Sequence, residues 1–420
     1  MLQVEYVNNG AIKKIIFFFC ILYLILPVVA IVFLFGMLFY QSRAKIDTRY
    51  LFLFFGMLAL YMGLINVTKV PYSDQVQYMN AYLLVPKQSI WQSLTNIYGE
   101  RTMTSGSTKE MGYGLLNIIG YVTSFGSYPL FVLEFICLLY WLYFMAIKRF
   151  FEIVSPAYSV SCILAASMIL CFFSQFFNLT IHLQRQEIAT AVMIYAIVDY
   201  SVTDKYHLKQ FLIPLFSVTL HTSVGLFLPL FFVKQFFKGI VKRKQVLVVI
   251  SVVLILLVLS TVLAASLLSS LGGQEIYALD RMAVAGSSEE DTFDISFILI
   301  FNIPLIFISL KNIWYPSLFG EETKENVFYL FYLIVSSFTL LTPDATMRYR
   351  YFMMSYAFWP FLLPLLIKKK NSLLKPYLLV VVAFLFFRFF ATFEAMPWKY
   401  ASLEDVLTDN VVFLYLCNPF

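Results

Sequence analysis

Three polar side chains lie close together in a sequence that is otherwise strongly apolar. Residues 180–188 read TIHLQRQEI, so Arg185 and Gln186 follow His182 by three and four positions. On a helix this spacing places the three side chains on one face. A guanidinium group with polar neighbours suits a phosphate or pyrophosphate, because its N–H groups match pairs of anionic oxygens. The alternative is that Arg185 extends to a membrane interface or pairs with a neighbouring Glu.

Two further arginines occur late in the chain, where residues 347–351 read MRYRY. Arg348 and Arg350 together also suit a pyrophosphate. The alternative is an interfacial belt of Arg and Tyr, which is common at the ends of membrane-spanning helices.

Three residues are candidates for a general base: Asp74, Glu110 and His221. Removing a proton from a hydroxyl group requires a carboxylate or an imidazole within hydrogen-bonding reach. Asp74 and Glu110 belong to a hydrophilic region, whereas His221 interrupts an apolar stretch. The alternatives are a solvated loop acid for either carboxylate and a hydrogen-bonded core residue for His221.

Membrane-spanning helices must position these residues. The 420 residues are 61% hydrophobic and only 13% charged, whereas a soluble domain carries about 25% charge. The mean hydropathy is +0.81. We predict an all-α polytopic membrane protein that forms a single multi-span domain, residues 1–420, with about ten transmembrane helices. The predicted spans are 15–40, 50–68, 128–147, 158–177, 180–198, 246–270, 294–312, 327–342, 351–367 and 376–391.

Basic residues in short loops predict the orientation. Lys and Arg gather at 43–49, at 148–149 and at 368–375, which favours the cytoplasmic side for these three loops. The loop 271–293 and a C-terminal tail, 392–420, then lie outside.

The same orientation places residues 69–127 outside as a large loop. Within it, the stretches 88–98 and 111–124 are predicted to be short amphipathic helices at the membrane interface.

The apolar stretch 208–233 has lysines on both flanks, so both of its ends favour the cytoplasm. We predict a re-entrant or strongly bent segment with His221, Thr222 and Ser223 at its tip, buried in protein or lining a wet cavity. The alternative is a single span with a basic loop outside.

Several classes of function lack their sequence signals. No P-loop, no Rossmann glycine motif, no HExxH and no GxSxG motif occurs, so nothing indicates ATP use or hydrolase chemistry. No metal-ligand spacing or disulfide framework appears among the five cysteines, so we assign no metal-ligating residues and expect no cofactor. The sequence leaves open whether the reaction requires a metal. The net charge of +6 arises from the loop lysines and arginines, so it does not indicate nucleic-acid binding.

The order of these motifs resembles that of a known family, the EpsG-like branch of Wzy-type polymerases of O-antigen, capsule and exopolysaccharide repeats. The motifs are Tyr72-Ser73-Asp74 with Tyr78, Glu110-Met111-Gly112-Tyr113-Gly114, Arg185-Gln186, His221-Thr222-Ser223 and Arg348-Tyr349-Arg350-Tyr351. The family often has Glu-Pro-Gly where this chain has Glu110-Met111-Gly112, a difference that concerns the geometry of the turn.

The resemblance implies a fold similar to the C-type membrane glycosyltransferases and a site at the outer face of the bacterial inner (plasma) membrane. A growing chain on undecaprenyl pyrophosphate would be the donor, and one repeat on the same lipid the acceptor. The sequence leaves open whether a chain-length regulator protein also binds.

The resemblance also implies roles for individual residues. Arg185, Arg348 and Arg350 would hold the pyrophosphate, with His182 and Gln186 beside them. Asp74, or else Glu110, would orient or deprotonate the acceptor hydroxyl, and His221 would line the cavity. Aromatic faces such as those of Tyr72 and Tyr78 suit sugar rings.

Two other functions fit the sequence. One is a C-type glycosyltransferase that moves a single sugar from a lipid donor, which differs in the length of its product. The other is a transporter of lipid-linked oligosaccharides, although such proteins usually carry internal repeats and none is seen here. A structural or assembly subunit is a third possibility, which the polar residues within apolar runs disfavour.

Overall fold

The computed structural model is helical throughout the part of the chain that it describes, which confirms the predicted all-α class. The residues described are 9–41, 47–71, 74–95, 110–172, 177, 180–203, 207–228, 230–231, 295–314, 323–341, 345–368, 374–395, 410 and 412. Several predicted features lie outside them, namely Tyr72, the span 246–270, the loop 271–293 and most of the tail 392–420.

Helices α3 (Thr48–Val67) and α7 (Tyr128–Val154) pack along each other at the centre of the molecule. Stacked rings of Phe55 and Phe144, with centroids 4.9 Å apart, lie in their contact. Among the described residues, these two helices have the length and apolar composition to cross a membrane. Other apolar helices are shorter, so the number of about ten spans stays a prediction.

Two of the predicted spans are each divided into two helices. The predicted span 15–40 forms α1 (Asn9–Ile25) and α2 (Pro27–Tyr40), and 351–367 falls into α17 (Ala345–Tyr356) and α18 (Trp359–Lys368). Each break lies beside a proline, Pro27 or Pro360. A proline ring clashes with the carbonyl four residues earlier and lacks the N–H that continues the helix.

Other boundaries differ from the prediction by a few residues. Helix α7 continues to Val154, so Lys148 and Arg149 belong to its last turns and not to a loop. Helix α8 (Ser159–Cys171) is shorter than predicted, and α10 (Gln184–Val202) begins four residues later than predicted.

Helix α11 (Lys209–Leu220) runs antiparallel to α10. At one end the buried Asp199 of α10 pairs with Arg149 and lies 3.8 Å from the Lys209 ammonium. Further along, the Ser217 hydroxyl donates to the carbonyl of Ala189 over 2.7 Å. Helix α11 therefore carries the chain from the C-terminal end of α10 back toward its N-terminal end.

The chain bends sharply at His221. Its backbone is extended, with φ −157° and ψ 127°, and the 3-10 helix η5 (Thr222–Phe227) follows directly. Phe231 then returns to Tyr200, with ring centroids 5.1 Å apart. Both ends of 208–231 thus lie near the C-terminal end of α10, with His221 at the far point. That this segment is re-entrant with respect to a membrane stays a prediction.

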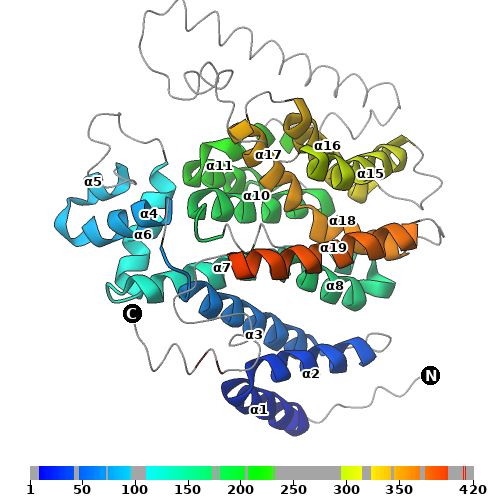
Figure 1. The fold of residues 1–420 in the computed structure, drawn as a ribbon, viewed down its shortest axis with the longest axis horizontal. Helices are drawn as coiled ribbons and strands as arrows, with labels where there is room; N and C mark the ends of the chain where they lie inside the picture. The colour runs from blue at the N-terminus through cyan, green and yellow to red at the C-terminus, as the bar shows by residue number, and fades with distance from the viewer. Residues whose placement is uncertain are drawn as a thin grey trace, which may run out of the picture.

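Three short helices lie at one end of α3 and α7, on the left in Figure 1. They are α4 (Asp74–Leu84), α5 (Ile90–Thr95) and α6 (Met111–Thr123). Helices are thus present in both stretches expected to be amphipathic, and α4 is an additional one. Their placement at a membrane interface stays a prediction.

The C-terminal helices form a further group that packs beside α10 and α8 (Figure 1). In addition to α17 and α18, they are α15 (Ile295–Trp314), α16 (Thr323–Leu341) and α19 (Leu374–Ala395). The buried Asn302 of α15 accepts hydrogen bonds from the Tyr332 hydroxyl over 2.9 Å and the Trp359 indole over 3.3 Å. This contact joins α15, α16 and α18, and α16 and α17 pack next to α10 and η5.

Candidate active site

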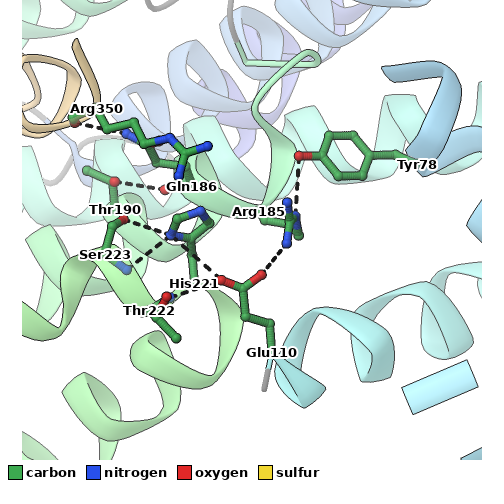
Figure 2. A network of polar contacts seen from close by, with 9 residues as sticks. All are labelled: Tyr78, Glu110, Arg185, Gln186, Thr190, His221, Thr222, Ser223 and Arg350. Carbon is green, nitrogen blue, oxygen red and sulfur yellow. Dashed lines mark hydrogen bonds and ion pairs between the residues drawn. The ribbon is translucent and has the colours of Figure 1, made fainter. Parts of the chain in front are cut away.

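Glu110 lies at the start of α6 and is only 7% exposed. One carboxylate oxygen, Oε1, accepts the backbone N–H of Thr222 over 3.1 Å. The other oxygen, Oε2, accepts a guanidinium N–H of Arg185. Both oxygens therefore have a donor, and the carboxylate is held in one orientation (Figure 2).

Arg185 lies in the first turn of α10 and is 6% exposed. Its Nε donates to the Tyr78 hydroxyl over 3.3 Å, and its guanidinium carbon lies 5.5 Å from the centroid of the Tyr78 ring. Arg185 thus joins α10 to α4 through Tyr78 and to α6 through Glu110 (Figure 2). The predicted alternative in which Arg185 pairs with a Glu is the arrangement seen, and the partner comes from a distant part of the chain.

His221 completes the cluster from the bend after α11. Its Nδ1 accepts the backbone N–H of Ser223 over 3.2 Å, so the ring caps η5. The Ser223 hydroxyl lies 2.7 Å from the same nitrogen. Glu110 Oε1 is 3.9 Å from Nδ1, which is close but beyond hydrogen-bonding distance.

Gln186 connects the cluster to α17. Its side-chain Nε2 donates to the backbone carbonyl of Arg350 over 2.9 Å, and its backbone carbonyl accepts the Thr190 hydroxyl over 2.7 Å. Arg350 is partly exposed. In the described part of the chain, its guanidinium has no recorded hydrogen bond or ion pair. Figure 2 shows this side chain reaching toward Gln186 and His221.

Two glycines after Glu110 allow α6 to approach its neighbours. A Cβ on Gly112 would meet the Thr219 side chain and would lie 3.0 Å from the Thr219 backbone on α11. A Cβ on Gly114 would lie 2.6 Å from the carbonyl oxygen of Leu94 on α5. Contacts this short exclude a side chain at either position. The two glycines in Glu110-Met111-Gly112-Tyr113-Gly114 therefore allow α6 to pack closely enough for Glu110 to contact Thr222.

The remaining predicted site residues lie around this cluster. Asp74 starts α4, one helical turn before Tyr78, and is partly exposed. No hydrogen bond or ion pair is recorded between Asp74 and the cluster among the described residues. Tyr78 is 2% exposed, so its ring is not open to a sugar in this structure. It contacts Tyr113 instead, with ring centroids 5.5 Å apart.

The position of His182 contradicts the prediction that it shares a helix face with Arg185 and Gln186. It is buried, but it lies in the turn before α10, so it does not share a helix face with Arg185 and Gln186.

On α17, Arg348 and Arg350 are two residues apart, a spacing at which helical side chains do not face each other. Arg350 lies beside the cluster, where its carbonyl accepts the Gln186 side chain and its charge acts on the His221 ring.

Sequence reasoning missed Gln184 as a site residue. Its side-chain oxygen accepts the Tyr113 hydroxyl over 2.6 Å, and its Nε2 donates to the Tyr128 hydroxyl over 3.3 Å. This network fixes the first turn of α10, which carries Arg185. Its position next to Arg185 in TIHLQRQEI was the available signal.

Two buried ionisable residues were also missed. Lys69 follows α3 and is 3% exposed, and its ammonium donates to the Asn66 side chain over 2.7 Å and the Phe177 carbonyl over 2.6 Å. Glu187 is 2% exposed on α10. Lys69 thus ties the end of α3 to the segment that leads to α10.

The arrangement offers a fixed carboxylate, a partnered guanidinium and a second guanidinium from α17. Such a set can orient a hydroxyl nucleophile and stabilise a negatively charged leaving group. Within the described residues, no group of three or more His, Cys, Asp or Glu side chains could hold a metal ion.

Comparison with known proteins confirms the predicted family. The family model described as the EpsG family matches residues 73–402, which is most of the chain and includes every residue of the cluster. No match was found among curated proteins or among solved structures. The chain therefore belongs to the EpsG family and is a membrane protein of the polysaccharide-polymerase type.

Proposed function

We propose that this protein joins oligosaccharide repeat units, carried on undecaprenyl pyrophosphate, into a surface polysaccharide such as O-antigen. The reaction takes place at the outer, periplasmic face of the bacterial inner membrane. The observation that carries the proposal is the buried cluster of Glu110, Arg185 and His221, which assembles from three distant parts of the chain. Family membership supports it, because the match includes all three residues.

In the proposed reaction, the terminal sugar hydroxyl of the acceptor repeat attacks the anomeric carbon of the donor chain. Glu110 takes the hydroxyl proton as the new glycosidic bond forms. The bond from the anomeric carbon to the pyrophosphate oxygen breaks, and undecaprenyl pyrophosphate leaves with the electron pair. The energy comes from this leaving group, so the reaction needs no nucleotide.

The structure favours Glu110 over Asp74 as the base. Glu110 is held by donors from α10 and η5, whereas Asp74 has no recorded contact with the cluster among the described residues. Arg185 holds Glu110 in place, and Arg350 offers an N–H-rich group for the pyrophosphate. Arg348 and Tyr72 stay predicted substrate contacts.

The test uses cells that lack this protein, complemented with wild type, with Glu110→Gln or with Glu134→Gln. Glu134 is a matched control, because its carboxylate accepts the Thr123 hydroxyl at the far end of α6, about 20 Å from Glu110 along the helix. We expect wild type and Glu134→Gln to restore the ladder of glycan lengths, and Glu110→Gln to leave a single repeat.

Other outcomes would replace the proposal. Accumulation of complete repeats on the cytoplasmic side of the membrane would establish a transporter. A repeat that is one sugar short would establish a transferase of single sugars. A full ladder of glycan lengths in cells without the protein would show that polymerisation does not require it.

A further inference from the structure

The hydrogen bonds of His221 determine which ring nitrogen carries its proton. The backbone N–H of Ser223 points at Nδ1 over 3.2 Å. A peptide N–H can only donate, so Nδ1 must accept with its lone pair. The Ser223 hydroxyl, 2.7 Å away, also has Nδ1 as its acceptor. A neutral His221 therefore carries its proton on Nε2.

This tautomer excludes a carboxylate–histidine relay between Glu110 and His221. In such a relay the carboxylate accepts a proton-bearing ring nitrogen and orients the other nitrogen as the base. Here Glu110 Oε1 faces Nδ1 at 3.9 Å, so two acceptors face each other. Glu110 takes its hydrogen bonds from Thr222 and Arg185 instead.

A basic role for Nε2 is also disfavoured. Accepting a proton at Nε2 requires the ring to lose its Nε2–H first and to move its proton to Nδ1. That shift would place an N–H against the N–H of Ser223 and break the cap of η5. A doubly protonated ring would have the same clash, and it would add a positive charge near Arg185 and Arg350, whose charges both act on the ring.

The second ring nitrogen of His221, Nε2, lies on the side of the ring where Arg350 could help it to bind an anion. Figure 2 shows it turned away from Ser223, toward the side of Gln186 and Arg350. No hydrogen bond to Nε2, and none to the guanidinium of Arg350, is recorded among the described residues. Within the described part of the chain, a neutral N–H donor therefore lies near a guanidinium group that has no recorded hydrogen bond, and the charge of that group acts on the His221 ring.

We propose that His221 is a hydrogen-bond donor to the leaving pyrophosphate through Nε2–H, together with Arg350, and is not the base of the reaction. This inference rests on the proposed function. Ser223 is then a positioning residue, because its N–H fixes the tautomer. Nε2–H stabilises the negative charge that develops as the anomeric carbon–oxygen bond breaks.

Two substitutions separate the functions of the two nitrogens. In His221→Gln the side-chain NH₂ lies near the place of Nε2–H, so the donor is kept and the cap is weakened. In His221→Asn the side-chain oxygen can accept the Ser223 N–H, so the cap is kept and the donor is lost. We expect the Asn variant to bind inorganic pyrophosphate about ten- to a hundredfold more weakly, the range for a lost hydrogen bond to a charged group. The Gln variant should stay within about tenfold of wild type in the same assay.

Polymerisation by the full-length protein in lipid vesicles should follow the same order. The dependence of its rate on pH should keep its acidic limb in the Gln variant, because the proposed base, Glu110, is unchanged there. If pyrophosphate binding is unchanged in both variants while the acidic limb disappears, His221 is the base and the proposal is overturned. Thermal unfolding of both variants shows whether a loss of activity comes from a loss of folded protein.

Nitrogen NMR tests the tautomer independently of the polymerase function. The chain has only three histidines, so ¹⁵N-labelled histidine gives three imidazoles, and His221→Gln identifies one of them by its loss. We expect a protonated Nε2 and an unprotonated Nδ1 for His221, and a shift of the Nε2 signal when pyrophosphate is added. A protonated Nδ1 would overturn the assignment. If His221 has the expected tautomer but the protein has no polymerase activity, only the proposed function is contradicted.

Discussion

Glu110 and Arg185 lie 75 positions apart in the chain, and their side chains form an ion pair in a site where both residues are less than a tenth exposed. Burial removes water from both charges, so each depends on the other and on its remaining hydrogen-bond partners. The group expected to grip a pyrophosphate is therefore engaged by the group expected to act as a base.

Replacing Glu110 with Gln keeps the shape of the side chain and its contact with Thr222, but it removes the proposed base. We expect polymerisation by the purified protein in lipid vesicles to fall at least about a hundredfold, because general-base catalysis contributes about 10²- to 10⁴-fold. Asp74→Asn, measured in parallel, should keep most of the activity. Loss of activity in Asp74→Asn with full activity in Glu110→Gln would transfer the role of base to Asp74.

A double-mutant cycle measures the coupling of Glu110 and Arg185. Arg185→Gln leaves a buried carboxylate without its cation, which costs about 3–5 kcal/mol of unfolding free energy, and Glu110→Gln leaves the opposite imbalance. The double variant, with two neutral amides, should be more stable than the sum of the single effects predicts. Thermal unfolding in one detergent gives the comparison. Strict additivity of the two effects would show that the ion pair contributes nothing to the folded state.

Gly112→Ala tests whether close packing of α6 on α11 brings Glu110 to its partners. The added Cβ would lie 3.0 Å from the Thr219 backbone, so α6 must shift, at a cost of about 1–3 kcal/mol. We expect lower stability and a loss of polymerisation. The matched control is Gly56→Ala on α3, where a Cβ would have no neighbour within 4 Å. There the substitution should stabilise the helix by about 0.5–1 kcal/mol. Equal behaviour of the two variants would contradict the proposed role of Gly112.

The orientation of the site can be read from two exposed positions in a cysteine-free background. Phe125, at the end of α6, is 90% exposed, and Leu208, just before α11, is 71% exposed. We expect Phe125→Cys to react with a membrane-impermeant maleimide in intact cells, and Leu208→Cys only after the membrane is permeabilised. The reverse pattern would place the cluster on the cytoplasmic side and would exclude polymerisation at the outer face.

The predictions from sequence succeeded where the physical signal is local. Apolar runs correctly predicted the helices α3, α7 and α16, because each run is long enough for its hydrophobic pattern to indicate a helix. They failed at Pro27 and Pro360, where the apolar pattern continues but the proline ring ends the helix. The three polar residues of 180–188 were placed on one helix face, whereas α10 starts at Gln184 and leaves His182 in a turn.

The sequence by itself determined the helical, membrane-protein character of the chain, and it supplied Glu110, Arg185 and His221 as candidates, because composition and residue type are local properties. Only the tertiary structure decided that Arg185 binds Glu110, that Thr222 donates to Glu110, and that Arg350 adjoins the cluster. The physical reason is that these contacts join segments far apart in the chain. Their meeting depends on how α6, α10, α11 and α17 pack, including the close approach at Gly112.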